Sequence, residues 1–225
     1  MRHMERVYSA KIPTLDIKDA YTKEPDERVR ELSMDEQNDL FDALRQDFHP
    51  FVKFVFMTGA RKTTIRDLLW RDVDLDTQTI VFRLKGGHRM TFAINQESAA
   101  LLSALPTSNI PEHARYVFTF VDQAKNERRR FVLGGFHGPW LKAVSIAGIK
   151  DFRFHDLRHT FATRMLRQTG NLKLVSRLLG HKSIDATMKY VHVLQDDIRD
   201  AQADFSTLGS IQSRENSRST TRKCS

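Results

Sequence analysis

Three short segments of the sequence carry basic and imidazole side chains whose polarity the surrounding apolar pattern does not require. They are Thr58-Gly59-Ala60-Arg61, His155-Asp156-Leu157-Arg158-His159 and Leu179-Gly180-His181, and Tyr190 follows nine residues after the last. His155 and Arg158 are three residues apart, a spacing that places them on one face of a helix. Two arginines and two histidines that converge on a phosphate could hold its non-bridging oxygens and stabilise the charge that develops during displacement at phosphorus.

The elements that must position the first of these segments follow from capping signals and hydrophobic spacing. A capping box at Ser33-Met34-Asp35-Glu36 predicts the start of a helix with one apolar face. A second helix is expected from about His49 to Met57, and Gly59 should end it. Arg61 is therefore expected in the bend before a third helix.

A hairpin is predicted next along the chain. Thr79 to Leu84 and Arg89 to Ile94 are rich in β-branched and apolar residues, and they flank a Lys85-Gly86-Gly87-His88 turn. Lys85 is thus expected at the tip. The basic run from Lys125 to Arg130 is interpreted as a solvated loop, with a phosphate contact as the alternative.

The C-terminal half has helical periodicity from Phe136 onward. One predicted helix carries Leu157, Phe161 and Met165, and another ends at Gly180. Ser183 is expected to cap a helix that runs through Tyr190 to about His192. The expected fold class is therefore mainly α with a small antiparallel β-sheet (α+β).

Composition limits the function classes. The 36 Lys and Arg residues exceed the 28 Asp and Glu residues, which gives a formal net charge of +8 and favours a polyanionic partner without proving one. The single cysteine, Cys224, excludes an intramolecular disulfide and a cysteine-based zinc site. We expect neither a membrane span nor a signal peptide, because the sequence has no sufficiently long apolar run.

Taken in order, the motifs resemble the active-site signature of tyrosine recombinases, the phage integrase family. The matching elements are Thr58-Gly59-x-Arg61, Lys85 of the hairpin, His155-x-x-Arg158, Gly180-His181 and Tyr190, and the resemblance extends from about Ser33 to Ala203. It implies the integrase catalytic-domain fold for residues 33–205. Residues 1–32 are then expected to form a linker or partly ordered arm, and residues 206–225 a polar, disordered tail.

The resemblance implies a site-specific recombinase or integrase that cleaves and rejoins DNA. Tyr190 would be the nucleophile, and its attack on the scissile phosphate would give a 3′-phosphotyrosine and a free 5′-hydroxyl. Since a phenol with a pKa near 10 attacks poorly at neutral pH, a base or nearby positive charge is needed. His155 is the implied base.

The other catalytic residues are assigned in the same way. Arg61 and Arg158 resemble the pair that grips the phosphate, Lys85 the lysine that protonates the departing 5′-oxygen, and His181 a further hydrogen-bond donor to the phosphate. Because cationic side chains would neutralise the charge, the resemblance implies no divalent metal, no ATP and no other cofactor.

The resemblance also implies partners and a location. Double-stranded DNA would be the substrate, four copies would assemble on paired DNA sites, and accessory DNA-bending proteins would assist. The protein would be bacterial or phage-encoded and would act in the cytoplasm, in association with the nucleoid. Neither the DNA target nor the choice between integration, excision, transposition and chromosome resolution follows from the motifs.

Two departures from the family pattern affect this interpretation. Thr64 stands where the family often has an acidic residue, so Arg61 needs another brace, for which Asp67 and Asp72 are candidates. The sequence upstream of residue 33 is also too short for the separate N-terminal helical domain of these enzymes. A truncated or minimal form is therefore expected.

Two other enzyme classes remain as alternatives. A type IB topoisomerase-like enzyme would use the same residues to nick and reseal one strand. His155 and His159 also approach the His-Glu-x-x-His pattern of zinc hydrolases, but Asp156 replaces the glutamate and no third ligand follows at a typical spacing. In the recombinase interpretation, His159 is a packed or hydrogen-bonded histidine that supports its neighbours.

Overall fold

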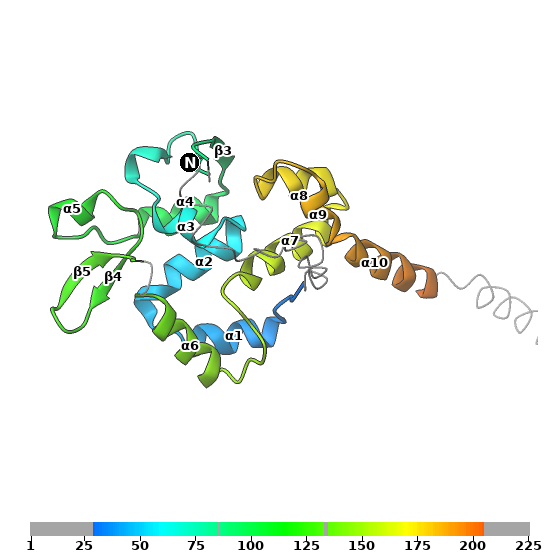
Figure 1. The fold of residues 1–225 in the computed structure, drawn as a ribbon, viewed down its shortest axis with the longest axis horizontal. Coiled ribbons are helices and arrows are strands. Elements are labelled where there is room, and N and C mark those ends of the chain that lie inside the picture. The colour runs from blue at the N-terminus through cyan, green and yellow to red at the C-terminus, as the bar shows by residue number, and fades with distance from the viewer. Residues whose placement is uncertain (1–28, 85, 133–134, 205–225) are drawn as a thin grey trace, which may run out of the picture.

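The computed structural model describes residues 29–84, 86–132 and 135–204, and within the last fourteen-residue helix it describes only some side chains. Helices form most of this part of the chain, together with two small antiparallel sheets, which confirms the predicted fold class (Figure 1). The helices are α1 (Met34–Ala43), η1 (Gln46–Phe48), α2 (His49–Thr58), α3 (Lys62–Arg66), η2 (Trp70–Asp72), α4 (Gln96–Ser103), α5 (Pro111–Ala114), α6 (His137–Ile146), α7 (Asp156–Thr169), α8 (Leu172–Leu178), α9 (Asp185–Met188) and α10 (Val191–Asp204). The strands are β1 (Val73–Asp74), β2 (Thr79–Arg83), β3 (Arg89–Ala93), β4 (Thr119–Asp122) and β5 (Glu127–Arg130).

The predicted capping box begins the first helix. The Ser33 hydroxyl accepts a hydrogen bond from the Glu36 backbone N–H, and the Glu36 carboxylate accepts one from the Ser33 N–H. Immediately before this cap, Leu32 is completely buried and its N–H donates to the hydroxyl of Thr160 on α7. The start of α1 is thereby attached to the helix that carries Arg158.

The predicted hairpin is confirmed by the pairing of β2 with β3. Its register joins Thr79 to Ala93 at one end and Arg83 to Arg89 at the other, and the Leu84 N–H donates to His88 O at 2.8 Å. β1 extends the sheet on the other side of β2, so the strand order is β1-β2-β3. Lys85, the predicted tip residue, lies outside the described residues.

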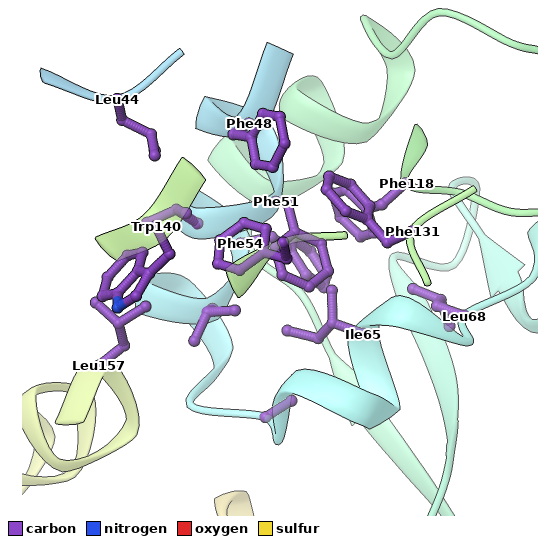
Figure 2. Packing of buried hydrophobic residues seen from close by; sticks show 14 of the residues in the cluster. Leu44, Phe48, Phe51, Phe54, Ile65, Leu68, Phe118, Phe131, Trp140 and Leu157 are labelled. Atoms are coloured by element: carbon purple, nitrogen blue, oxygen red, sulfur yellow. The ribbon is translucent and has the colours of Figure 1, made fainter. Parts of the chain in front are cut away.

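A core rich in phenylalanine joins α2 to the elements around it. Phe48 and Phe51 both contact Phe131 and Phe136, with ring centroids 4.6 to 5.8 Å apart across the set, and Figure 2 shows Phe48, Phe51 and Phe131 in one cluster with Phe54 and Phe118. Since these rings come from η1, α2 and the segment that leads into α6, the core holds α2 in place. The end of α2 then sets the position of the bend at Gly59.

A second, smaller cluster lies between α7 and α8. It comprises Phe161, Ala162, Leu166, Val175, Leu179 and Tyr190. Beyond it, α10 leaves the body of the molecule (Figure 1). The single helix expected from Ser183 to about His192 is wrong: α9 ends at Met188, α10 begins at Val191, and Tyr190 lies in the break between them.

The predicted loop at Lys125 to Arg130 is also wrong in part, because Glu127 to Arg130 form β5 and are half-buried. Pairing with β4 makes this run a strand, and its arginines find acceptors nearby. Arg130 donates to the Tyr116 hydroxyl at 2.7 Å, and Arg129 donates to Glu127 at 2.7 Å. Within the described part of the chain, no helix combines the length and apolar character needed to cross a membrane.

Candidate active site

Arg158 is the central side chain of the candidate site. It lies in the first turn of α7 and is only 3% exposed. Its guanidinium donates to the backbone oxygens of Gly59 and Leu179, both at 2.8 Å, and to Nε2 of His181 at 2.8 Å. Arg158 thus joins α7 to the end of α2 and to the end of α8, which brings the three predicted segments together.

Gly59 makes this approach possible. Its φ of 62° is in the left-handed region, and a Cβ on this residue would stand 2.2 Å from Cδ1 of Phe161 on α7. Any larger residue would push α7 away from the end of α2. The bend then leads to Arg61, which precedes the first residue of α3 and has a half-buried side chain.

The charges of the two arginines act on each other. Burial lowers the pKa of Arg158 to about 10, the positive charge of Arg61 acts in the same direction, and Tyr190 opposes them. Arg158 remains protonated at neutral pH. The effect of Arg61 indicates that the two guanidinium groups are near each other, so a ligand between them would be anionic.

Arg61 lacks the predicted brace. Asp67 pairs with Arg66, and Asp72 pairs with Arg83 at 2.7 Å. In residues 29–84, 86–132 and 135–204, the Arg61 guanidinium makes no hydrogen bond to Thr64 or to either aspartate. Thr64 and the two aspartates line a cavity of about 370 Å³ together with Arg61. The guanidinium donors of Arg61 are therefore available to a ligand in this cavity.

His181 is held by hydrogen bonds to both of its ring nitrogens. Nε2 faces the Arg158 guanidinium, and Nδ1 lies 2.7 Å from the hydroxyl of Thr187 on α9. Because a guanidinium can only donate, Nε2 must be the acceptor and Nδ1 must carry the proton. The preceding residue, Gly180, faces the hairpin: a Cβ there would stand 3.1 Å from Cδ1 of Leu84. The turn end of the hairpin, next to the predicted position of Lys85, therefore lies against the loop that carries His181.

His155 lies just before α7 and is exposed, in contrast to the buried Arg158. Desolvation by the surrounding protein lowers the pKa of His155, and the positive charges of Arg158, Lys189 and Arg61 lower it further, whereas Asp156 raises it. The neutral imidazole is therefore favoured at neutral pH. In this form the ring can accept a proton.

Tyr190 contacts a different histidine from the one that the motifs suggest. Its hydroxyl lies 2.8 Å from Nδ1 of His159, and the two side chains are 1% and 3% exposed. The edge of the His159 ring in turn meets His155, with centroids 5.1 Å apart. His159 was predicted to be a packed or hydrogen-bonded supporter, which these contacts confirm, but its contact with the Tyr190 hydroxyl was missed. The spacing of four residues between the two histidines was the available signal.

The zinc alternative finds little support in this arrangement. Across the described ranges, no three His, Cys, Asp or Glu side chains form a group that could hold a metal ion. His155 and His159 share a face of α7, but the charge of Arg158 lies beside them. The arrangement suits an anion rather than a cation.

Comparison with known proteins places these residues within a family pattern. A model described as "Phage integrase family" matches residues 30–196. The integrase of Salmonella phage P22 is 27% identical over 175 residues, which cover 74% of this chain and 44% of that protein. The chain thus spans less than half the length of this curated relative.

Solved structures give the same result for the fold. The crystal structure of XerA recombinase superimposes with a TM-score of 0.61 at 26% sequence identity, over 80% of this chain and 66% of that one. The XerH site-specific recombinase, bound to palindromic difH substrate in a post-cleavage complex, has a TM-score of 0.58 at 19% identity, over 78% of this chain and 53% of that one. Both similarities extend over most of the described residues.

Proposed function

Since the chain belongs to the phage integrase family, we propose that it acts as a tyrosine recombinase, a site-specific enzyme that cleaves and rejoins double-stranded DNA through Tyr190. The observation that carries this proposal is the hydrogen bonding of the buried Arg158, which gathers the bend before Arg61, the His181 loop and α7 around one anion-binding region. The XerH recombinase was crystallised with its palindromic difH substrate, which supports a recombination site in duplex DNA as the proposed ligand.

In the proposed reaction, the Tyr190 oxygen attacks the scissile phosphorus as the bond from phosphorus to the 5′-oxygen breaks. His155 accepts the phenol proton, and Lys85 supplies a proton to the departing 5′-oxygen. Arg61, Arg158 and His181 stabilise the charge on the non-bridging oxygens. Because the phosphotyrosine keeps the energy of the phosphodiester, reversal of the same steps by a second 5′-hydroxyl rejoins the DNA without ATP.

For His181 to donate to a phosphate through Nε2, its hydrogen bond from Arg158 has to open. A phosphate oxygen would replace His181 Nε2 as the acceptor for Arg158. Once Nε2 carries a proton, His181 would donate a hydrogen bond to the same phosphate. In this structure, Arg158 and His181 instead satisfy each other. We propose that DNA binding exchanges these contacts.

The assembly follows from the number of strands exchanged. Recombination of two duplexes breaks four strands, and each break needs one nucleophile, so four copies of a chain with one Tyr190 are required. We propose a tetramer on paired sites, with accessory DNA-bending proteins where the site demands them, and a location on bacterial or phage DNA in the cytoplasm.

A suicide substrate tests the proposed function. The protein is incubated with duplexes that carry a nick beside candidate attachment sites, taken from the DNA that flanks its gene. We expect an adduct that survives denaturation in sodium dodecyl sulfate and forms equally with a chelator present, because no step needs a metal.

Two controls separate the other enzyme classes. Loss of activity with the chelator would favour the zinc alternative, and relaxation of any supercoiled plasmid, without need for a site, would favour the topoisomerase-like alternative. The absence of an adduct on every candidate site would contradict the recombinase proposal.

The lowered pKa of His155 predicts the acidic limb of the pH profile. A base works only when unprotonated. As the pH falls, the cleavage rate should therefore reach half of its maximum below pH 6.5, the ordinary pKa of an imidazole. The measurement is the cleavage rate at subsaturating DNA, which reports on the free enzyme. His155→Gln should remove this limb. A half-maximal rate at or above pH 6.5 in the unaltered protein would contradict the assignment.

A further inference from the structure

The hydroxyl of Tyr190 is covered in this structure. The side chain is 1% exposed and belongs to the cluster that includes Phe161, Val175 and Leu179. An attacking oxygen must come within about 3–3.5 Å of the phosphorus. Because so little of the residue is exposed, a DNA phosphate has no open path to the oxygen, and the hydroxyl has to move before it can attack.

His155, which lies at the N-cap of α7, and His159 within α7 indicate the direction of this movement. His155 is exposed beside the phosphate-binding arginines, whereas His159, four residues further along α7, is buried. Four residues correspond to about 6 Å along an α-helix. The Tyr190 hydroxyl is bound to the buried histidine and is therefore withdrawn from the exposed one by about one helical turn.

The backbone around Tyr190 allows such a shift. Lys189 and Tyr190 form a two-residue break between α9 and α10, where the Tyr190 N–H donates to Thr187 O at 3.0 Å and the Val193 N–H donates to Tyr190 O at 3.1 Å. A change of dihedral angles in the break leaves the internal hydrogen bonds of α10 intact. The phenol can then be carried along α7 by a movement of the short segment.

We propose that His159 is a positioning residue for the nucleophile: its Nδ1 holds the Tyr190 hydroxyl in the withdrawn position until DNA binds. This inference rests on the proposed function of Tyr190. The hydrogen bond stabilises the withdrawn state relative to the state in which the hydroxyl faces the phosphate. It therefore lowers the reactivity of Tyr190 in the free protein. DNA binding must supply the free energy that breaks this hydrogen bond.

Three substitutions separate the hydrogen bond from the packing of the ring. His159→Phe keeps a ring of similar size but has no Nδ1, and His159→Leu is a second variant without the acceptor. His159→Asn keeps an amide group near the position of Nδ1, so it can still bind the hydroxyl. Neither Asn nor Phe can accept a proton from the phenol.

The first measurement needs no DNA. Nitration of each tyrosine by tetranitromethane is followed by peptide mass spectrometry, with Tyr116, whose hydroxyl is bound by Arg130, as the internal reference for an intact fold. We expect Tyr190 nitration to rise about 2- to 10-fold in the Phe and Leu variants, the range that corresponds to the net contribution of one hydrogen bond. The Asn variant should stay near the unaltered protein.

The second measurement is single-turnover cleavage of the suicide substrate. The Phe and Leu variants should cleave at least as fast as the unaltered protein, because the withdrawn state is weakened. Unchanged Tyr190 nitration in both variants would overturn the inference, and so would slower cleavage by the Phe, Leu and Asn variants alike, which would make His159 a proton acceptor. If the unaltered protein forms no adduct, the proposed function fails, while the nitration result still tests the hydrogen bond.

Discussion

Tyr190→Phe is expected to abolish the covalent adduct with the suicide substrate while leaving DNA binding intact. The substitution keeps the ring that packs against Phe161 and Leu179 and removes only the attacking oxygen. Because no other group can take its place in the break between α9 and α10, the cleavage rate should fall by on the order of 10⁴-fold or more. The measurement is adduct formation on denaturing gels, together with a gel-shift assay of binding.

Tyr116→Phe is the matched control. Tyr116 is also largely buried, but its hydroxyl accepts its hydrogen bond from Arg130 on β5, whereas the Tyr190 hydroxyl contacts His159. Removal of the Tyr116 hydroxyl should leave the yield of the covalent adduct unchanged. A normal yield of adduct with Tyr190→Phe would refute the assignment of the nucleophile.

Arg158→Lys is expected to have the second large effect, on both activity and stability. A lysine keeps the charge but cannot donate in the planar fork that reaches Gly59 O, Leu179 O and His181 Nε2 at once. Cleavage should fall by roughly 10²–10³-fold, the loss typical for one donor to a developing oxyanion. Unfolding should become easier by roughly 2–3 kcal/mol, because buried acceptors lose their partner.

Arg61→Lys separates these two effects. Arg61 is expected to share the phosphate with Arg158, but within the described ranges its guanidinium makes no hydrogen bond to the protein. Its substitution should therefore lower cleavage by a similar factor and leave the denaturant midpoint unchanged within error. The two variants are compared by single-turnover cleavage and by urea unfolding. Equal stability of the two would show that the Arg158 network contributes nothing to the fold.

Local patterns were sufficient to predict much of the fold and the composition of the site. The capping box at Ser33, the left-handed glycine at Gly59 and the hairpin between Thr79 and Ala93 all depend on residues within a few positions of one another. Such features follow from backbone sterics and short-range hydrogen bonding, which are the same in any tertiary context. The position of Lys85 at the tip of the hairpin and its role as a proton donor remain predictions, because this residue lies outside the described residues.

Errors arose where tertiary contacts outweighed the local pattern. The spacing after Ser183 favoured one continuous helix, but the hydrogen bond between Thr187 and His181 holds the end of α9, and the packing of Tyr190 on α7 turns the chain before α10. The basic run forms a strand since its arginines find partners on β4 and at Tyr116. These partners lie 6 to 31 residues from the groups that they hold, and no helical or strand spacing predicts such contacts.

The sequence by itself determined which groups are available to the reaction: two arginines, two histidines and a tyrosine, in the order and helical spacing of a recombinase. Only the tertiary structure decided how these groups meet. Arg158 reaches across 99 residues to Gly59, and Tyr190 reaches across 31 residues to His159 rather than to His155. The physical reason is that a hydrogen bond between distant residues depends on how whole helices pack, and no local spacing specifies that packing.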